Sequence, residues 1–119
     1  MATPNILGLT TVNGNTTVQS CTTSATAIVE NAADSGKIYK INSLIISNID
    51  GTSSADITVD LYRSSTAYHI VKTVAVAADS AFNAIDKTGT IYLLEGDALR
   101  CTASADGDLQ AVCSFEEMS

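Results

Sequence analysis

The chain has 119 residues, which suits one domain with a single core and leaves no room for a second. Hydrophobic residues make up 45% of it, which excludes intrinsic disorder; Trp is absent and aromatic residues make up 5%, so Ile, Val, Leu and Ala must build the core. The net charge of −7 excludes nucleic-acid binding because the chain would repel phosphate backbones, and no apolar run approaches the ~20 residues of a membrane span. We expect a soluble domain without a secretion signal.

Residues 1–15 are expected to form an N-terminal arm. They contain the only proline of the chain and a turn-forming Asn-Gly-Asn sequence. The side chains that this arm offers for burial are Ile6, Leu7 and Leu9, so these three residues are the candidate contacts with a neighbouring subunit. The remaining residues, 16–119, would form a single β-domain.

Two short, Thr-rich strands are expected at 16–23 and 25–30. The densest β-branched run of the chain follows at 38–63, and it predicts a hairpin whose two strands are joined by a turn at 50–54. The other strands would add to this hairpin.

The two strands of the predicted hairpin differ in their pattern. In the second, Ile57, Val59 and Leu61 alternate with polar residues such as Asp60, the period of 2 that is typical of a strand with one face on a core and one in water. In the first, residues 44–46 (LII) are apolar in succession, so both faces should be covered and the strand should be central.

Five further strands are expected at 68–76, 81–86, 90–94, 98–103 and 108–115. The last three would form a meander, with Gly107 as the left-handed residue of its second turn. The predicted cross-strand pairs on its buried face are Leu93 with Leu99, Ile91 with Cys101, Leu99 with Cys113, Cys101 with Ala111 and Ala103 with Leu109.

Strand spacings of about 8 to 12 residues without any helical period predict an all-β fold, an antiparallel β-sandwich or jelly roll of eight or nine strands. The residues expected to be buried in it are Leu44, Ile45, Ile46, Ile57, Val59, Leu61, Ile70, Val74, Leu93, Leu99 and Phe115.

The sequence offers little for catalysis. His69 is the only histidine, so any Ser-His-Asp or Cys-His arrangement would have to include it. It alternates with Tyr68 and Ile70 on its predicted strand and should point outward, which favours an ordinary surface histidine. We therefore expect no enzyme, no catalytic residue and no cofactor.

Metal binding is also not expected. The cysteines Cys21, Cys101 and Cys113 include no C-x-x-C pair, and the last two occupy inward strand positions, so all three are predicted to be free thiols in the core. Acidic loop residues could bind calcium or form a glycosidase pair, but no EF-hand spacing occurs, and turn chemistry explains them better. The residues concerned are Asp50, Asp56, Glu95, Asp97, Asp106 and Asp108.

Three segments carry a resemblance: SATAIVENA, GKIYKINSLIISNIDGTSSADITVDLYRSS and IYLLEGDALRCTASADGDLQAVCSFEEMS. In these the chain resembles small virion structural proteins of tailed bacteriophages, especially those of marine cyanophages. The resemblance covers most of the length and implies a small, mostly β protein without an enzymatic role. It supplies no catalytic residues.

The resemblance implies a capsid decoration (cement) protein that binds the outer surface of the head as an oligomer, a homotrimer, in virions assembled in the host cytoplasm. Its partners would be further copies of itself and the major capsid protein or other virion proteins. A neck, tail or fibre-attachment component of the virion is an alternative, because these proteins reuse small β-sandwiches. A host-surface carbohydrate-binding module is a third reading, which the absence of Trp disfavours.

Overall fold

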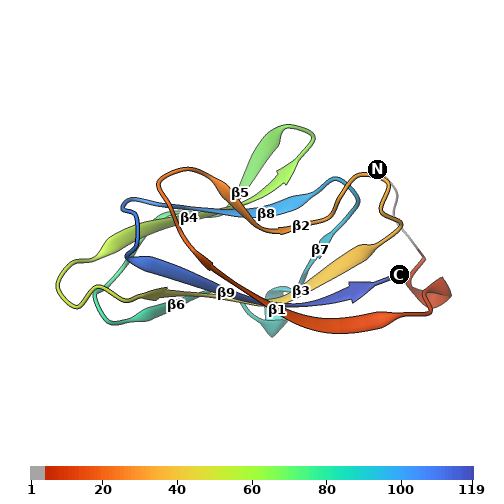
Figure 1. Ribbon diagram of the computed structural model, residues 1–119, viewed down its shortest axis with the longest axis horizontal. Coiled ribbons are helices and arrows are strands. Elements are labelled where there is room, and N and C mark those ends of the chain that lie inside the picture. Colours follow the sequence, from red (N-terminus) through yellow and green to blue (C-terminus); the bar gives the residue numbers. More distant parts are fainter. Residues whose placement is uncertain (1–4) are drawn as a thin grey trace.

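A computed structural model describes residues 5–119, and in this range the strands form two antiparallel sheets that pack face to face (Figure 1). The strands are β1 (Val12–Ser20), β2 (Thr26–Glu30), β3 (Ile38–Asn48), β4 (Ala55–Arg63), β5 (Thr66–Val76), β6 (Ala81–Ile85), β7 (Ile91–Leu93), β8 (Ala98–Ala103) and β9 (Leu109–Met118), and the 3₁₀ turns are η1 (Ile6–Gly8) and η2 (Lys87–Gly89). The predicted all-β sandwich of eight or nine strands is confirmed. No helix among the described residues is long and apolar enough to cross a membrane.

The strand order is that of a jelly roll. One sheet has the order β1-β9-β3-β6, with β7 also paired to β3, and the other has the order β2-β8-β4-β5. β6 and β7 pair with successive parts of β3 and act as one strand interrupted by η2. Most connections cross from one sheet to the other, and β4 and β5 form the one hairpin of consecutive strands within a sheet among residues 5–119.

The hairpin predicted at 38–63 is wrong. β3 lies in the β1 sheet and β4 in the opposite sheet, so the loop between them, 49–54, bridges the two layers. β3 is central in its sheet, as predicted, between β9 and the β6/β7 strand. A polar loop of this length can serve as a hairpin turn or as an arch between sheets, and its sequence does not distinguish the two.

The predicted meander of the last three strands is also wrong in its pairing. β8 pairs with β2 and β4, whereas β7 and β9 lie in the other sheet. The cross-strand pairs predicted between them therefore do not form. The predicted left-handed residue is confirmed: Gly107 has a φ of 84° in the arch between β8 and β9.

The core lies between the sheets and is built largely from aliphatic residues, with Phe115 stacked on Tyr39 at a ring-centroid distance of 5.6 Å. Of the residues expected to be buried, seven are: Leu44, Ile46, Ile57, Val59, Leu93, Leu99 and Phe115. Leu61, Ile70 and Val74 are half-buried against this core. The predicted inward side of the meander strands is correct as well, because Cys101, Ala103, Leu109, Ala111 and Cys113 are all buried.

Two of the predicted side-chain environments are wrong. Ile45 was expected inside but is 36% exposed, because the outer face of the β1 sheet has no covering layer. Asp60 was expected in water but is only 2% exposed, because Arg100 of the neighbouring strand covers it and donates a hydrogen bond from Nε to Oδ1 at 2.9 Å.

The domain begins earlier than the predicted arm of 1–15 allows. β1 starts at Val12, and its first residues pair with the end of β9 from Val12 opposite Met118 onward. The Asn-Gly-Asn sequence read as a turn is thus part of a strand, because β9 extends far enough to pair with it. The segment before β1 that the structure describes is 5–11; residues 1–4 of the predicted arm, including the proline, lie outside the described residues.

Candidate interaction surface

The N-terminal segment, residues 5–11, owes its shape to short-range hydrogen bonds. Asn5 caps η1: its Oδ1 accepts the Leu7 N–H at 3.1 Å and its carbonyl accepts the Gly8 N–H at 2.9 Å. At the other end of the segment, the N–H groups of Thr10 and Thr11 both donate to the carbonyl of Ser119 at 2.9 Å. The segment is therefore tied to the end of the chain just before it enters β1.

The apolar side chains of this segment keep much of their surface exposed within residues 5–119. Leu7 is 95% exposed and Ile6 is 46% exposed, and no residue of η1 is buried. Leu9 is half-buried. All three residues predicted to contact a neighbour thus lie at the surface, two of them with large exposed apolar areas. Isolated exposed apolar side chains are common, but adjacent ones on a terminal segment can bind a partner.

β1 continues from this segment as an edge strand. It pairs only with β9, over nine residue pairs without a shift in register, and all of its residues are exposed or half-buried. The Thr16 N–H donates to Asn15 Oδ1 at 2.8 Å rather than to β9. Because ladder donors alternate along an edge strand, the N–H groups of Gly14 and Val18 face the same free edge.

The opposite edge of the molecule is built differently. β5 pairs with β4 through two register shifts, and Thr73 within it has a φ of 53°, a left-handed conformation that is unusual for a β-branched residue. Lys72 beside it is exposed. Bulges and an edge lysine are devices that prevent one sheet from pairing with another, so β5 is a protected edge and β1 is not.

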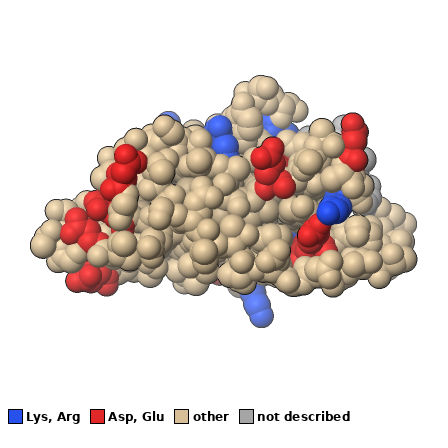
Figure 2. Space-filling model, viewed as in Figure 1, with Lys and Arg blue, Asp and Glu red and all other residues tan. Residues whose placement is uncertain are grey.

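Charge is distributed unevenly along the chain. Residues 1–29 contain no Asp, Glu, Lys or Arg, and the first charged side chain is Glu30. β1 and β2 lie on the same side of the sandwich, and Figure 2 shows this side with uncharged residues along the middle of β1 and with charged groups beyond it, one acidic group lying near the centre of the view. We call the surface made by β1 the uncharged flank; the loop that leads to β2 is not part of it, because Asp106 Oδ1 accepts the Thr23 N–H there at 2.8 Å.

An apolar row crosses the outer face of the β1 sheet next to this flank. Val18 pairs with Val112, which pairs with Ile45, so the three side chains stand in register on one face. Val18 is 72% exposed, Ile45 is 36% exposed and Val112 is half-buried. The shallow groove at the edge of this row is lined by Val18, Gln19, Ser20, Gln110, Ala111 and Val112.

Two ion pairs involve carboxylates that the sequence analysis placed at the surface. Asp97 has no exposed area; Arg63 donates to it from Nε at 2.9 Å and Nη2 at 2.6 Å, and these bonds raise the pKa of the Arg63 guanidinium. Asp97 Oδ2 also accepts the Leu94 N–H at 2.8 Å.

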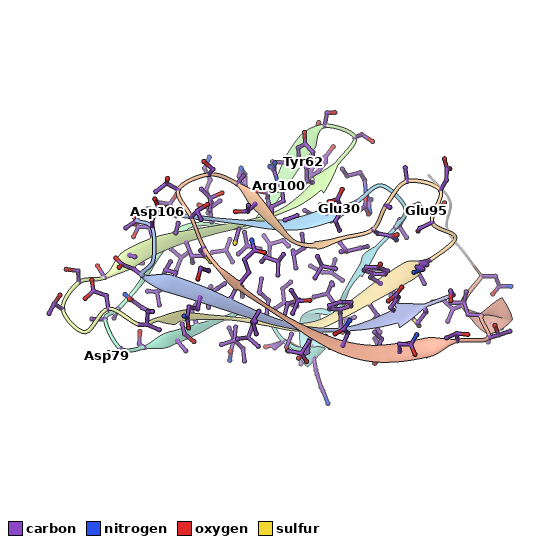
Figure 3. The ribbon with its side chains drawn as sticks, in the orientation of Figure 1. Glu30, Tyr62, Asp79, Glu95, Arg100 and Asp106 are labelled. Carbon is purple, nitrogen blue, oxygen red and sulfur yellow. The ribbon has the colours of Figure 1, made fainter. Side chains whose placement is uncertain are left out.

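Arg100, the partner of Asp60, lies 3.9 Å above the centre of the Tyr62 ring. Figure 3 shows Arg100 and Tyr62 side by side on the outer face of their sheet. The Asp60–Arg100 pair joins β4 to β8, and the Asp97–Arg63 pair joins the loop before β8 to β4.

Two more of the residues weighed as sites are His69 and Asp50. His69 is exposed on β5. Asp50 Oδ1 accepts the N–H and the hydroxyl of Thr52, both at 2.9 Å, which lowers the pKa of Asp50 and fixes the loop. Among residues 5–119, no group of three or more His, Cys, Asp or Glu residues is placed to hold a metal ion.

The three cysteines are free and buried. Burial raises the pKa of the Cys113 thiol to about 12. A hydrogen bond with Cys21 and burial both raise the pKa of Cys101, so this thiol also stays protonated near neutral pH.

No protein-family model and no curated protein matches the chain. The chain does match a solved structure described as "Bacillus endospore appendages form a novel family of disulfide-linked pili". The two chains superpose with a TM-score of 0.54 at 17% sequence identity. The match covers 98% of this chain and 95% of that one. At this identity the likeness establishes a shared β-sandwich fold.

Proposed function

We propose that the chain is a non-enzymatic structural subunit that works by binding other protein subunits, and that it decorates the outer surface of a bacteriophage head. The observation that supports subunit binding is the exposed apolar pair Ile6 and Leu7 on a segment that Thr10 and Thr11 tie to Ser119 at its far end. The segment has no charge that a neighbour would have to neutralise.

The contact is large enough to matter. Burying the exposed parts of Ile6, Leu7 and Leu9 against a neighbour would contribute roughly 2 to 5 kcal/mol before ordering costs. On a head with many binding positions, a modest contact made by every copy stabilises the whole shell. The virion part of the proposal rests on the sequence resemblance over most of the chain, and the jelly roll agrees with it because capsid proteins use this fold.

The test uses two exposed sites of similar chemistry. The double variant Ile6→Ser, Leu7→Ser removes the apolar contact, and Tyr68→Ser changes another exposed large side chain, 57% exposed on β5. Each variant is added to heads that lack the protein, and occupancy is measured by gel densitometry and cryo-electron microscopy. We expect the double variant to lose binding and Tyr68→Ser to bind as the unchanged chain does. Full occupancy by the double variant would disprove the role of the segment, and failure of the unchanged chain to bind heads would disprove the decoration role.

A second candidate function is a subunit of a protein fibre, and the observation that favours it is the likeness to a pilus protein over 98% of this chain. A fibre subunit would polymerise without a head. Electron microscopy of the concentrated pure protein distinguishes the two candidates: filaments support the fibre, whereas discrete particles that bind only to heads support decoration. A virion copy number of a dozen or fewer would instead support the neck or tail.

A further inference from the structure

The free edge of β1 has the features of a strand that pairs with another strand. It is nine residues long, regular, and without proline or charge. The other edge strands described between residues 5 and 119 are each interrupted or protected: β2 has five residues and a register shift, β6 and β7 are separated by η2, and β5 carries two bulges and Lys72. Among the described edges, the long regular one of β1 is therefore the edge best suited to pair with another strand.

The charge distribution indicates what pairs there. A second copy of this chain also carries −7, so two copies repel each other over most orientations. The uncharged flank is a surface through which they can meet without opposing like charges, since residues 1–29 contribute none. Two identical strands can also satisfy each other completely when they run antiparallel about a two-fold axis.

We propose that β1 of one copy pairs antiparallel with β1 of a second copy, so that the two β1 sheets become one continuous sheet. The register that uses all nine residues places Thr16 opposite Thr16 and Val12 opposite Ser20. It also sets Val18 of each copy opposite Gly14 of the other. A Cβ built on Gly14 would have no atom within 4 Å, so there is open space beside it for the valine side chain.

Asn15 has a specific part in this contact. In the single chain its Oδ1 accepts the Thr16 N–H, which would otherwise be an unpaired donor at the free edge. Pairing exchanges this side-chain acceptor for a backbone carbonyl of the second copy. The contact thus replaces one hydrogen bond at Thr16 and adds partners for the free donors of Gly14 and Val18.

This inference rests on the proposal that the chain acts as an assembled subunit, but its test needs no virion. If heads are not bound and the isolated protein still pairs through β1, the decoration role fails and this inference stands. If the chain binds heads but substitutions in β1 leave its native mass unchanged, the decoration role stands and this inference fails. The contact joins copies in pairs and is separate from the trimer expected for a decoration protein.

Charges at the proposed axis give the sharpest experiment. Thr16→Lys and Thr16→Glu each place like charges directly opposite across the two-fold, while an equimolar mixture places opposite charges there. Ala75→Lys, at an exposed position on the protected edge β5, is the matched control. Native mass spectrometry and light scattering measure the mass, and circular dichroism verifies folding.

We expect each Thr16 variant alone to halve the native mass, the mixture to restore it as a mixed pair, and the control to keep the unchanged mass. Hydrogen exchange gives a second reading: the Gly14 and Val18 amides should become protected as protein concentration rises. A monomeric unchanged chain, a purely trimeric mass that neither Thr16 variant alters, or Gly14 and Val18 amides that exchange alike at all concentrations would overturn the proposal.

Discussion

Leu44 and Ile45 are neighbours in sequence with nearly the same chemistry, and the sandwich treats them in opposite ways. Leu44 points between the sheets and has no exposed surface, whereas Ile45 points out of the uncovered face of the β1 sheet. The free energy of folding therefore depends on the first side chain and hardly on the second.

Truncating these two residues tests that difference. Leu44→Ala should lower the free energy of unfolding by about 2 to 5 kcal/mol, because it removes buried apolar surface and leaves a cavity. Ile45→Ala should lower it by less than about 1 kcal/mol, since its side chain is already partly in water. Urea titrations followed by circular dichroism measure both. Equal losses would mean that the outer face of this sheet is covered.

Facing was predictable for most strand residues because side chains alternate with a period of 2, and this held for Ile57, Val59 and Leu99. The prediction of facing failed where the burial of a side chain depends on a residue of another strand. Asp60 is buried because Arg100 covers it, and the sequence around Asp60 contains no sign of that partner. The exposed Ile6 and Leu7 could be identified as candidate contacts, because that segment has no further apolar pattern in which to bury them.

The thiol of Cys113 gives a second test at this scale. Burial raises its pKa from an ordinary value of 9.0 to about 12, so in the folded chain it stays protonated while an unfolded thiol ionises. Because the thiolate is the form that alkylating reagents attack, we expect Cys113 to remain unlabelled by iodoacetamide at about pH 9 until urea unfolds the protein. The same shift makes folding less stable as pH rises from 9 toward 12, since the unfolded chain loses the proton first. Rapid labelling of the folded protein, read by peptide mass spectrometry, would contradict the burial.

At the scale of elements, the side of a strand that is buried and the strands that it pairs with are separate questions. β7, β8 and β9 have the inward residues that the alternation predicts, yet β8 belongs to the other sheet. The two layers share one core, so a strand with a given pattern fits either of them. Short loops with Gly96 or Gly107 can turn within a sheet or arch between sheets, and only the pairing of distant strands decides between the two.

Engineered disulfides distinguish the observed pairing from the meander. Thr58 and Thr102 are directly opposite on β4 and β8, at a spacing of about 4.5 to 5.5 Å between Cα atoms in such pairs, so Thr58→Cys with Thr102→Cys should cross-link under mild oxidation. The control pair, Thr102→Cys with Gln110→Cys, would be opposite in a meander but lies on two different sheets. Mass spectrometry of cross-linked peptides reads both. A control pair that cross-links as well as the first would contradict the jelly roll.

At the scale of the whole molecule, the boundary between tail and domain lies before Val12. Removing residues 1–9 takes away η1 and keeps the bonds from Thr10 and Thr11 to Ser119. This deletion should leave the thermal midpoint nearly unchanged. Removing residues 1–15 also deletes the first part of β1 and exposes the end of β9, and it should lower the midpoint clearly. Calorimetry measures the thermal midpoints of the two truncated chains. Equal midpoints would mean that the domain begins at residue 16, as the sequence analysis predicted.

The attachment of β1 to β9 has a mechanical consequence. If a partner that holds the N-terminal segment pulls it along the axis of β1 against the rest of the domain, the force enters the domain at Thr10 and Thr11. The nine residue pairs between β1 and β9, together with the bonds of Thr10 and Thr11 to Ser119, then bear the load side by side in shear. Bonds loaded together resist a force far better than bonds that open one after another. A subunit tethered in this way therefore resists detachment by a force along β1 better than by a force that separates the residue pairs one at a time.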